Sequence, residues 1–89
     1  MAKVVWTSLA LRQRDKIDRR YQGSITAKVA ELENWPNVAV DSKKLKGSRS
    51  HFRMRVGKYR IIFEVMKGEP VIIEIQEVLR RTDQTYSKH

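Results

Sequence analysis

The sequence contains no cysteine, so disulfide bonds and thiolate chemistry are both excluded. It has no histidine and cysteine cluster at the spacing of a metal site, and no glycine-rich loop between a strand and a helix to hold a nucleotide. No apolar run approaches the length that spans a membrane, and the N-terminal residues become charged too early for a signal peptide. We therefore expect a cytoplasmic protein that uses no metal or cofactor and does not bind membranes.

Acidic residues are also scarce. The 89 residues include 19 Lys and Arg but only 10 Asp and Glu, which gives a formal net charge of +9. The excess is local, because residues 41–63 carry eight basic residues and a single acid, Asp41. Self-repulsion in so dense a cluster opposes compaction. The sequence therefore predicts a polyanion or an acidic protein as partner, and an ordinary solvated basic surface is the alternative.

The apolar pattern predicts an α+β domain with the element order β-α-α-β-β-β over residues 1–89. Thr7 or Ser8 is expected to cap the first helix, Gly23-Ser24 to separate the two helices, and Trp35-Pro36 to end the second. We expect the two helices to pack on one face of a small, twisted, mostly antiparallel sheet, with room for a short C-terminal helix. The expected strands are 2–6, 51–56, 59–66 and 70–78, the helices are 9–22 and 25–34, and a polar connection occupies 37–50.

Basic residues alternate with apolar ones on the strands expected at 51–56 and 59–66. If the apolar residues face the helices, the two-residue period sends Arg53, Arg55 and Arg60 to the opposite, open face. Neighbouring strands lie only about 5 Å apart, so the three guanidinium groups would share one patch. Like charges this close are costly unless an anion lies among them, and the planar fork of arginine suits the oxygens of phosphate.

Two stretches, LKGSRSHFRMRVGKYRIIFEV at 45–65 and VIIEIQEVLRRTDQTY at 71–86, resemble the RelE/ParE superfamily of bacterial type II toxins. The shared pattern is a leucine, a basic residue and a glycine, then an alternating basic strand, then glycine, tyrosine and arginine. The resemblance covers nearly the whole chain and implies a RelE/ParE-like, microbial-RNase-like fold. Basic residues after the last strand, followed by a tyrosine, resemble the RelE branch, whose members are ribosome-dependent endoribonucleases that cleave mRNA.

The resemblance also implies roles for individual residues. RelE-type enzymes commonly carry lysines at the positions of Arg53 and Arg55, an arginine at the position of Arg60, and an arginine and a tyrosine at those of Arg80 and Tyr86. Cationic groups would stabilise the charge that develops on the phosphate when the 2′-hydroxyl attacks it. The tyrosine would either stack on an unstacked base or hold the scissile nucleotide by its hydroxyl. We expect the basic residues around this set to bind the substrate: Lys43, Lys44, Lys46, Arg49, Lys58 and Arg81.

The identity of the general base is open at this stage. Arginine stays protonated in proteins and is a poor proton acceptor. Arg53 and Arg55 therefore do not supply the general base that lysines at these positions could supply. Histidine titrates near neutrality, which makes His51 and His89 candidates. Glu64 is a third candidate if its side chain shares the open face with Arg60.

A RelE-type toxin implies particular partners. These are a cognate antitoxin, the ribosomal A site with its mRNA, and operator DNA bound through the antitoxin in a hetero-oligomeric complex. Two other functions stay open, a ParE-like inhibitor of DNA gyrase without enzymatic activity and an RNA-binding module that does not cleave. The residues have structural alternatives too, since Arg53 and Arg55 can be solvated strand residues and Tyr86 can be a packing residue of the tail.

Overall fold

The structure is a computed structural model that describes residues 1–37, 42–45, 47 and 50–81. The predicted order of helices and strands is confirmed, and a short additional strand, β2, lies in the segment expected to be a polar connection. No helix in the described ranges combines the length and apolar character needed to cross a membrane. The elements are β1 (Lys3–Trp6), α1 (Ser8–Asp15), α2 (Arg19–Ala30), the 3-10 helix η1 (Glu31–Asn34), β2 (Ser42–Lys44), β3 (His51–Val56), β4 (Tyr59–Met66) and β5 (Ile72–Arg80).

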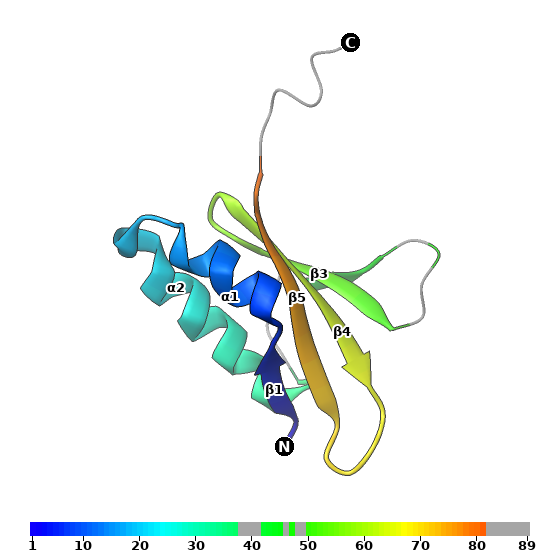
Figure 1. Ribbon diagram of the computed structural model, residues 1–89. Helices are drawn as coiled ribbons and strands as arrows, with labels where there is room; N and C mark the ends of the chain where they lie inside the picture. The colour runs from blue at the N-terminus through cyan, green and yellow to red at the C-terminus, as the bar shows by residue number, and fades with distance from the viewer. Residues whose placement is uncertain (38–41, 46, 48–49, 82–89) are drawn as a thin grey trace.

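The strands form one mixed sheet in the order β1-β5-β4-β3-β2. β1 runs parallel to β5, and every other pair is antiparallel, as the sequence predicts for most of the sheet. Both helices cover the same face of the sheet (Figure 1). The opposite face has no helix against it among the described residues, and this surface is called the open face below.

The core lies between the helices and the sheet. Ile25 and Val29 of α2 are at most 1% exposed, and they pack with buried side chains of β3, β4 and β5. Phe63 at the centre stacks on Phe52 with ring centroids 5.6 Å apart, and Trp35 meets Phe52 edge-on at 4.9 Å. Full burial of each large apolar side chain contributes about 1.5–3 kcal/mol, so this cluster fixes which face of each strand points inward.

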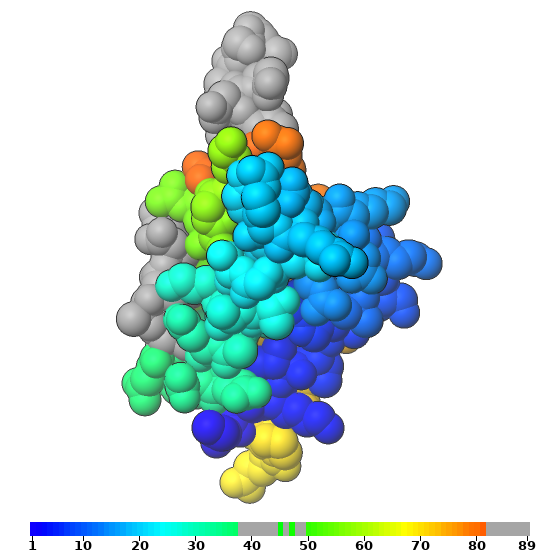
Figure 2. All heavy atoms as spheres, turned by 90° about the vertical axis from the view of Figure 1, so that its left-hand side faces the viewer, coloured from blue at the N-terminus to red at the C-terminus, as the bar shows by residue number. Residues whose placement is uncertain are grey.

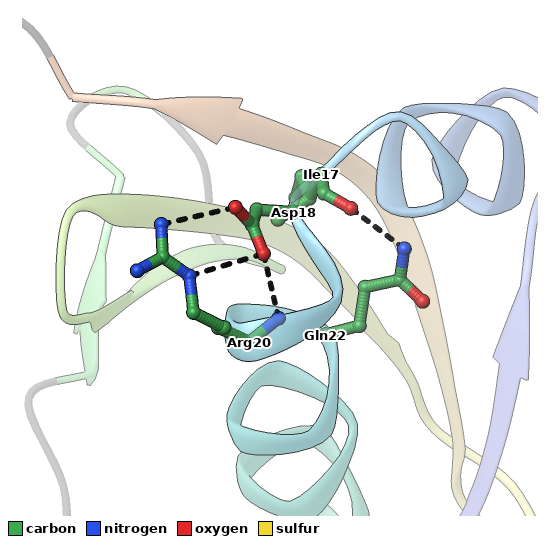
Figure 3. Close-up of polar contacts among 4 residues, drawn as sticks. All are labelled: Ile17, Asp18, Arg20 and Gln22. Atoms are coloured by element: carbon green, nitrogen blue, oxygen red, sulfur yellow. Dashed lines mark hydrogen bonds and ion pairs between the residues drawn. The ribbon is translucent and has the colours of Figure 1, made fainter.

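The two helices are separated at residues 16–18, and the prediction that Gly23-Ser24 separates them is wrong. The side chain of Asp18 caps α2 by accepting a hydrogen bond from the backbone N–H of Arg20 at 2.9 Å. Gln22 donates to the carbonyl of Ile17 at 2.7 Å and closes the same turn (Figure 3). Gly23 lies inside α2 on its exposed side, where a residue without a side chain loses no packing.

An extra residue in β5 changes which of its side chains face the helices. Phe63 of β4 is opposite Ile75, but Ile62 is opposite Glu77, which leaves Gln76 as a β-bulge. Ile75 and Val78 are therefore both buried although they are three residues apart. Strict alternation from Ile75 would point Val78 to the open face and Glu77 to the helices. Because of the bulge, these residues and those that follow point to the other face.

Helix α1 is anchored to β5 next to this bulge. The side-chain oxygen of Gln13 accepts a hydrogen bond from the backbone N–H of Val78 at 2.7 Å, beyond the point where β1 stops pairing with β5. Thr7, which caps α1 as predicted, also donates its hydroxyl to the carbonyl of Gln76 at 3.3 Å. Gln13 thus provides a hydrogen-bond acceptor for the backbone N–H of Val78, which the sheet leaves unpaired.

Candidate nucleic-acid interface

Two arginines lie directly opposite each other on the open face. Arg55 of β3 pairs with Arg60 of β4 in the strand register, next to the turn that joins the two strands. Opposed residues in antiparallel strands have Cα atoms only about 4.5–5.5 Å apart. Arg53, two residues along β3 and opposite Ile62, faces the same side. The structure therefore brings together the three arginines that the sequence predicts to share the open face.

These arginines have no carboxylate partner among the described residues. The ion pairs found there join Arg14 to Asp15, Arg20 to Asp18, Lys28 to Glu31, and His51 to Glu64. Within the described part of the chain, the buried Nε of Arg60 also has no hydrogen-bond partner.

The arrangement of Arg55 and Arg60 is unfavourable unless an anion is bound. Like charges directly opposed across two strands are destabilising. A buried donor without an acceptor, such as the Nε of Arg60, costs about 1–3 kcal/mol. A phosphate group between the two guanidinium groups would relieve both costs, because it supplies negative charge and several acceptor oxygens.

Arg80 lies on the other side of the sheet. It is opposite Tyr59, which is 9% exposed and faces the helices, because the bulge at Gln76 reverses the alternation of β5. Arg81 stays close to the turn between β3 and β4, where its Nη1 donates to the carbonyl of Gly57 at 3.3 Å. The structure thus separates Arg80 from the three arginines of the open face.

Glu64 and His51, the described candidates for a general base, form a separate cluster on the open face. Nε2 of His51 is 3.6 Å from a carboxylate oxygen of Glu64, and Ser50 donates to the other oxygen at 3.3 Å. Gln76 donates to both Glu64, at 3.0 Å, and Glu74, at 3.1 Å. Glu64 is four residues along β4 from Arg60, a Cα separation of about 13 Å at 3.3 Å per residue. Neither candidate is therefore in reach of a group bound between the paired arginines.

Some predicted residues can be placed only in part. On β2, Lys43 is opposite Arg53 and Lys44 is opposite Phe52 in the strand register. The backbone of Lys43 therefore lies beside that of Arg53. Lys58 lies exposed in the turn between β3 and β4. In the described ranges, no three histidine, aspartate or glutamate side chains are grouped so that they could hold a metal ion. Four predicted site residues lie outside the described residues: Lys46, Arg49, Tyr86 and His89.

A cleft of about 580 Å³ opens on the helix side, at the end of the sheet near the turn between β3 and β4. This cleft is not predictable from local sequence pattern, since its walls come from three distant segments and depend on the bulge in β5. Figure 2 shows the tip of the two helices, this turn and the end of β5 gathered at one end of that side. The residues that line the cleft are Gln13, Lys16, Ile17, Asp18, Arg20, Tyr21, Lys58, Tyr59, Val78 and Arg80.

At the edge of the cleft, Asp18 and Arg20 form a two-contact ion pair. Nε and Nη2 of Arg20 lie 3.3 and 3.1 Å from the two carboxylate oxygens (Figure 3). The guanidinium and, to a lesser extent, the backbone N–H of Arg20 lower the pKa of Asp18 below its usual value. The same carboxylate raises the pKa of Arg20. Arg20 is thus already neutralised, while the other cations of the cleft are not.

We expect this pair to make stability depend on pH in the acidic range. A carboxyl group with a lowered pKa in the folded state stabilises the fold above its unfolded pKa, and this contribution disappears as the pH falls through the folded pKa. Asp18→Asn keeps a side chain that can cap a helix but removes the charge. Urea unfolding should therefore show the wild type to be modestly more stable at neutral pH, with the difference vanishing in acid. A difference that does not change with pH would contradict this assignment.

The comparisons with known proteins agree with this fold. The family model described as the ParE toxin of the type II toxin–antitoxin system parDE matches residues 4–85. The chain belongs to the RelE/ParE superfamily of type II toxins. No curated protein matches the sequence of this toxin.

Solved structures show the same fold as this toxin. RelE in the RelE–RelB complex from Pyrococcus horikoshii is 21% identical with a TM-score of 0.76, and the match covers 92% of this chain and 97% of that one. The isolated RelE toxin of E. coli is 19% identical with a TM-score of 0.76, covering 97% and 92%. The RelB–RelE antitoxin–toxin complex from Methanococcus jannaschii matches at 26% identity and a TM-score of 0.68, covering 85% and 88%.

Proposed function

We propose that this toxin is an endoribonuclease that cleaves mRNA on the ribosome and thereby stops translation. The observation that carries the proposal is the opposed pair of Arg55 and Arg60, which has no carboxylate partner among the described residues and includes a buried, unpaired Nε. Such a pair is suited to hold a phosphate between its two guanidinium groups. An enzyme that cleaves RNA without a metal ion uses positive charge of this kind to stabilise the scissile phosphate in the transition state.

The proposed reaction needs no metal ion. The 2′-oxygen of the nucleotide attacks the adjacent phosphorus, and the bond from phosphorus to the 5′-oxygen breaks. The products are a 2′,3′-cyclic phosphate and a free 5′-hydroxyl. Arg55 and Arg60 would stabilise the extra negative charge of the pentavalent transition state, which is commonly the largest single contribution to catalysis. The ribosome would align the 2′-hydroxyl, an effect worth several kcal/mol.

Two proton transfers complete the reaction, one from the 2′-hydroxyl and one to the leaving 5′-oxygen. Glu64 and His51 lie about 13 Å along their strands from the paired arginines, so they do not reach the scissile phosphate bound there. We therefore assign proton transfer to the C-terminal tail, where Tyr86 and His89 are the titratable candidates. Both lie outside the described residues.

We propose a cognate antitoxin as the protein partner. The solved complexes from P. horikoshii and M. jannaschii each hold a RelE protein with its RelB partner, and this toxin shares their fold. The net charge of +9 favours an acidic or amphipathic segment in the partner, which would cover the basic surface and form the hetero-oligomer. Such a complex would act in the cytoplasm and bind operator DNA through the antitoxin.

The test is to map RNA ends after the toxin is induced in growing cells. We expect new 3′ ends that carry a 2′,3′-cyclic phosphate, located inside translated codons and absent from untranslated RNA. Purified toxin should produce the same ends in mRNA bound to ribosomes. Growth arrest without any new RNA ends would overturn the proposed function.

A second candidate is inhibition of DNA gyrase without enzymatic activity. It is favoured by the family model that matches residues 4–85, since that model is described as a ParE toxin. In this case induction should cause DNA breaks and a DNA-damage response, and mRNA should remain intact. The same culture can supply both measurements, so the two functions are directly distinguishable.

A further inference from the structure

The cleft on the helix side has positive charge that nothing in the described chain neutralises. Of its four cationic residues, Arg20 is paired with Asp18, the one carboxylate that lines the cleft. The remaining three are Lys16, Lys58 and Arg80, and none of them forms an ion pair with a described residue. The cleft therefore favours an anionic occupant.

The cleft also has an aromatic and apolar floor. Tyr59 is 9% exposed, and its ring lies 5.9 Å from that of Tyr21, centroid to centroid, with Ile17 and Val78 beside them. An occupant that suits this site has an anionic group for the rim and a flat or apolar body for the floor. Nucleotides have both features, and bases pack on aromatic side chains without requiring a particular sequence.

The rim of the cleft is continuous with the arginines of the open face around one end of the sheet. Arg60 and Tyr59 are consecutive in β4, so their side chains point to opposite faces, and Arg80 is the register partner of Tyr59. Lys58, in the turn itself, lines the cleft and precedes both residues. The end of the sheet thus carries positive charge on both faces and on the edge between them.

We propose that an RNA strand bound on the open face continues around this end of the sheet, and that the helix-side cleft holds a nucleotide flanking the cleavage position. In this arrangement Arg80, Lys58 and Lys16 contact phosphates beyond the scissile one. The inference rests on the proposed function, since it extends the same RNA strand. An extended strand offers a phosphate at every step and can follow cations placed on two faces, whereas an acidic peptide needs carboxylates at matching positions.

The test measures binding of a fluorescent single-stranded oligouridine with 2′-O-methyl groups, which the toxin cannot cleave. The key variant is Lys16→Ala, because Lys16 is exposed and its backbone hydrogen bonds do not require its side chain. The matched control is Arg12→Ala, which removes one charge from an exposed position on α1, the helix that ends just before Lys16, outside the cleft. Each phosphate contact with a single strand contributes about 0.7 to the slope of log affinity against log salt. We expect Lys16→Ala to reduce that slope by about 0.7 and Arg12→Ala to leave it unchanged.

Two further variants separate this inference from the proposed function. Arg55→Ala tests the open face, and Arg80→Ala tests the cleft. If Arg55→Ala weakens binding but Lys16→Ala and Arg80→Ala behave like Arg12→Ala, the inference is wrong and the open-face site stands. If the cleft variants retain RNA binding but lose affinity for the purified antitoxin, the cleft binds a protein, which also overturns the inference. If no variant changes the binding of RNA, the proposed function fails as well.

Discussion

Replacing Arg60 with alanine should abolish growth arrest while the fold persists. In the proposed mechanism this residue contributes charge and hydrogen bonds to the transition state, and loss of one such donor typically lowers the rate about 100–1000-fold. Cleavage of ribosome-bound mRNA should fall by that factor, and cells that express Arg60→Ala should grow normally. The measurement combines growth after induction with the rate of appearance of RNA ends.

The structure supplies controls for this experiment. Arg60 has no described ion-pair partner, and its Nε is buried without an acceptor, so its removal should not lower the free energy of unfolding. Arg12→Ala removes the same charge from an exposed position on α1 and should remain fully toxic. Arg60→Lys keeps the charge but loses the planar fork, and should retain only part of the activity. Full growth arrest by Arg60→Ala would mean that the opposed arginines are not the active site.

Two single-residue deletions in β5 should differ greatly in stability although both remove the bulge. Deleting Gln76 leaves Ile75 opposite Phe63 and Glu77 opposite Ile62, so every inward residue keeps its place. The loss is then limited to the hydrogen bonds of Gln76, about 1 kcal/mol each. Deleting Glu74 instead moves Ile75 to the open face and puts Gln76 in the core position that Ile75 occupied.

The second deletion should therefore cost far more. Removing a buried isoleucine from the core costs about 2–5 kcal/mol, and a buried amide without partners adds about 1–3 kcal/mol. Small domains are stable by only about 5–15 kcal/mol, so the Glu74 deletion should be largely unfolded. Urea denaturation and the dispersion of amide signals in an NMR spectrum would measure both variants. Equal stability of the two deletions would contradict the position of the bulge.

Much of the architecture follows from the sequence because alternation and helical spacing report burial directly. The strands at 51–56 and 59–66 have the predicted bounds, and Met54, Ile61 and Phe63 are buried as their alternation requires. The same alternation correctly predicts Arg53, Arg55 and Arg60 on one open face, since a period of two leaves no other arrangement. Local pattern is sufficient in these strands because the pairing of β3 with β4 contains no irregularity.

The position of Arg80 could not be predicted in this way, because its face depends on one extra residue in a strand. The sequence carries a trace of the bulge in the consecutive polar residues Gln76 and Glu77, after which Val78 rather than residue 77 is buried. The predicted boundary between the two helices was also wrong. Glycine is a common helix breaker, but Gly23 lies within α2. The helix instead begins after Asp18, whose side chain caps it by accepting a hydrogen bond from the backbone N–H of Arg20.

The arrangement of charge along the sheet has a consequence for how the molecule meets its target. Lys16, Lys58 and Arg80 line the cleft at the end formed by the helix tip and the β3–β4 turn, and none of them has an ion-pair partner among the described residues. This end of the molecule is therefore a local centre of positive charge. The field of a polyanion attracts this cationic end before contact and favours orientations in which it faces the target. Encounters would begin in a favourable orientation more often than by chance, and added salt would remove this advantage.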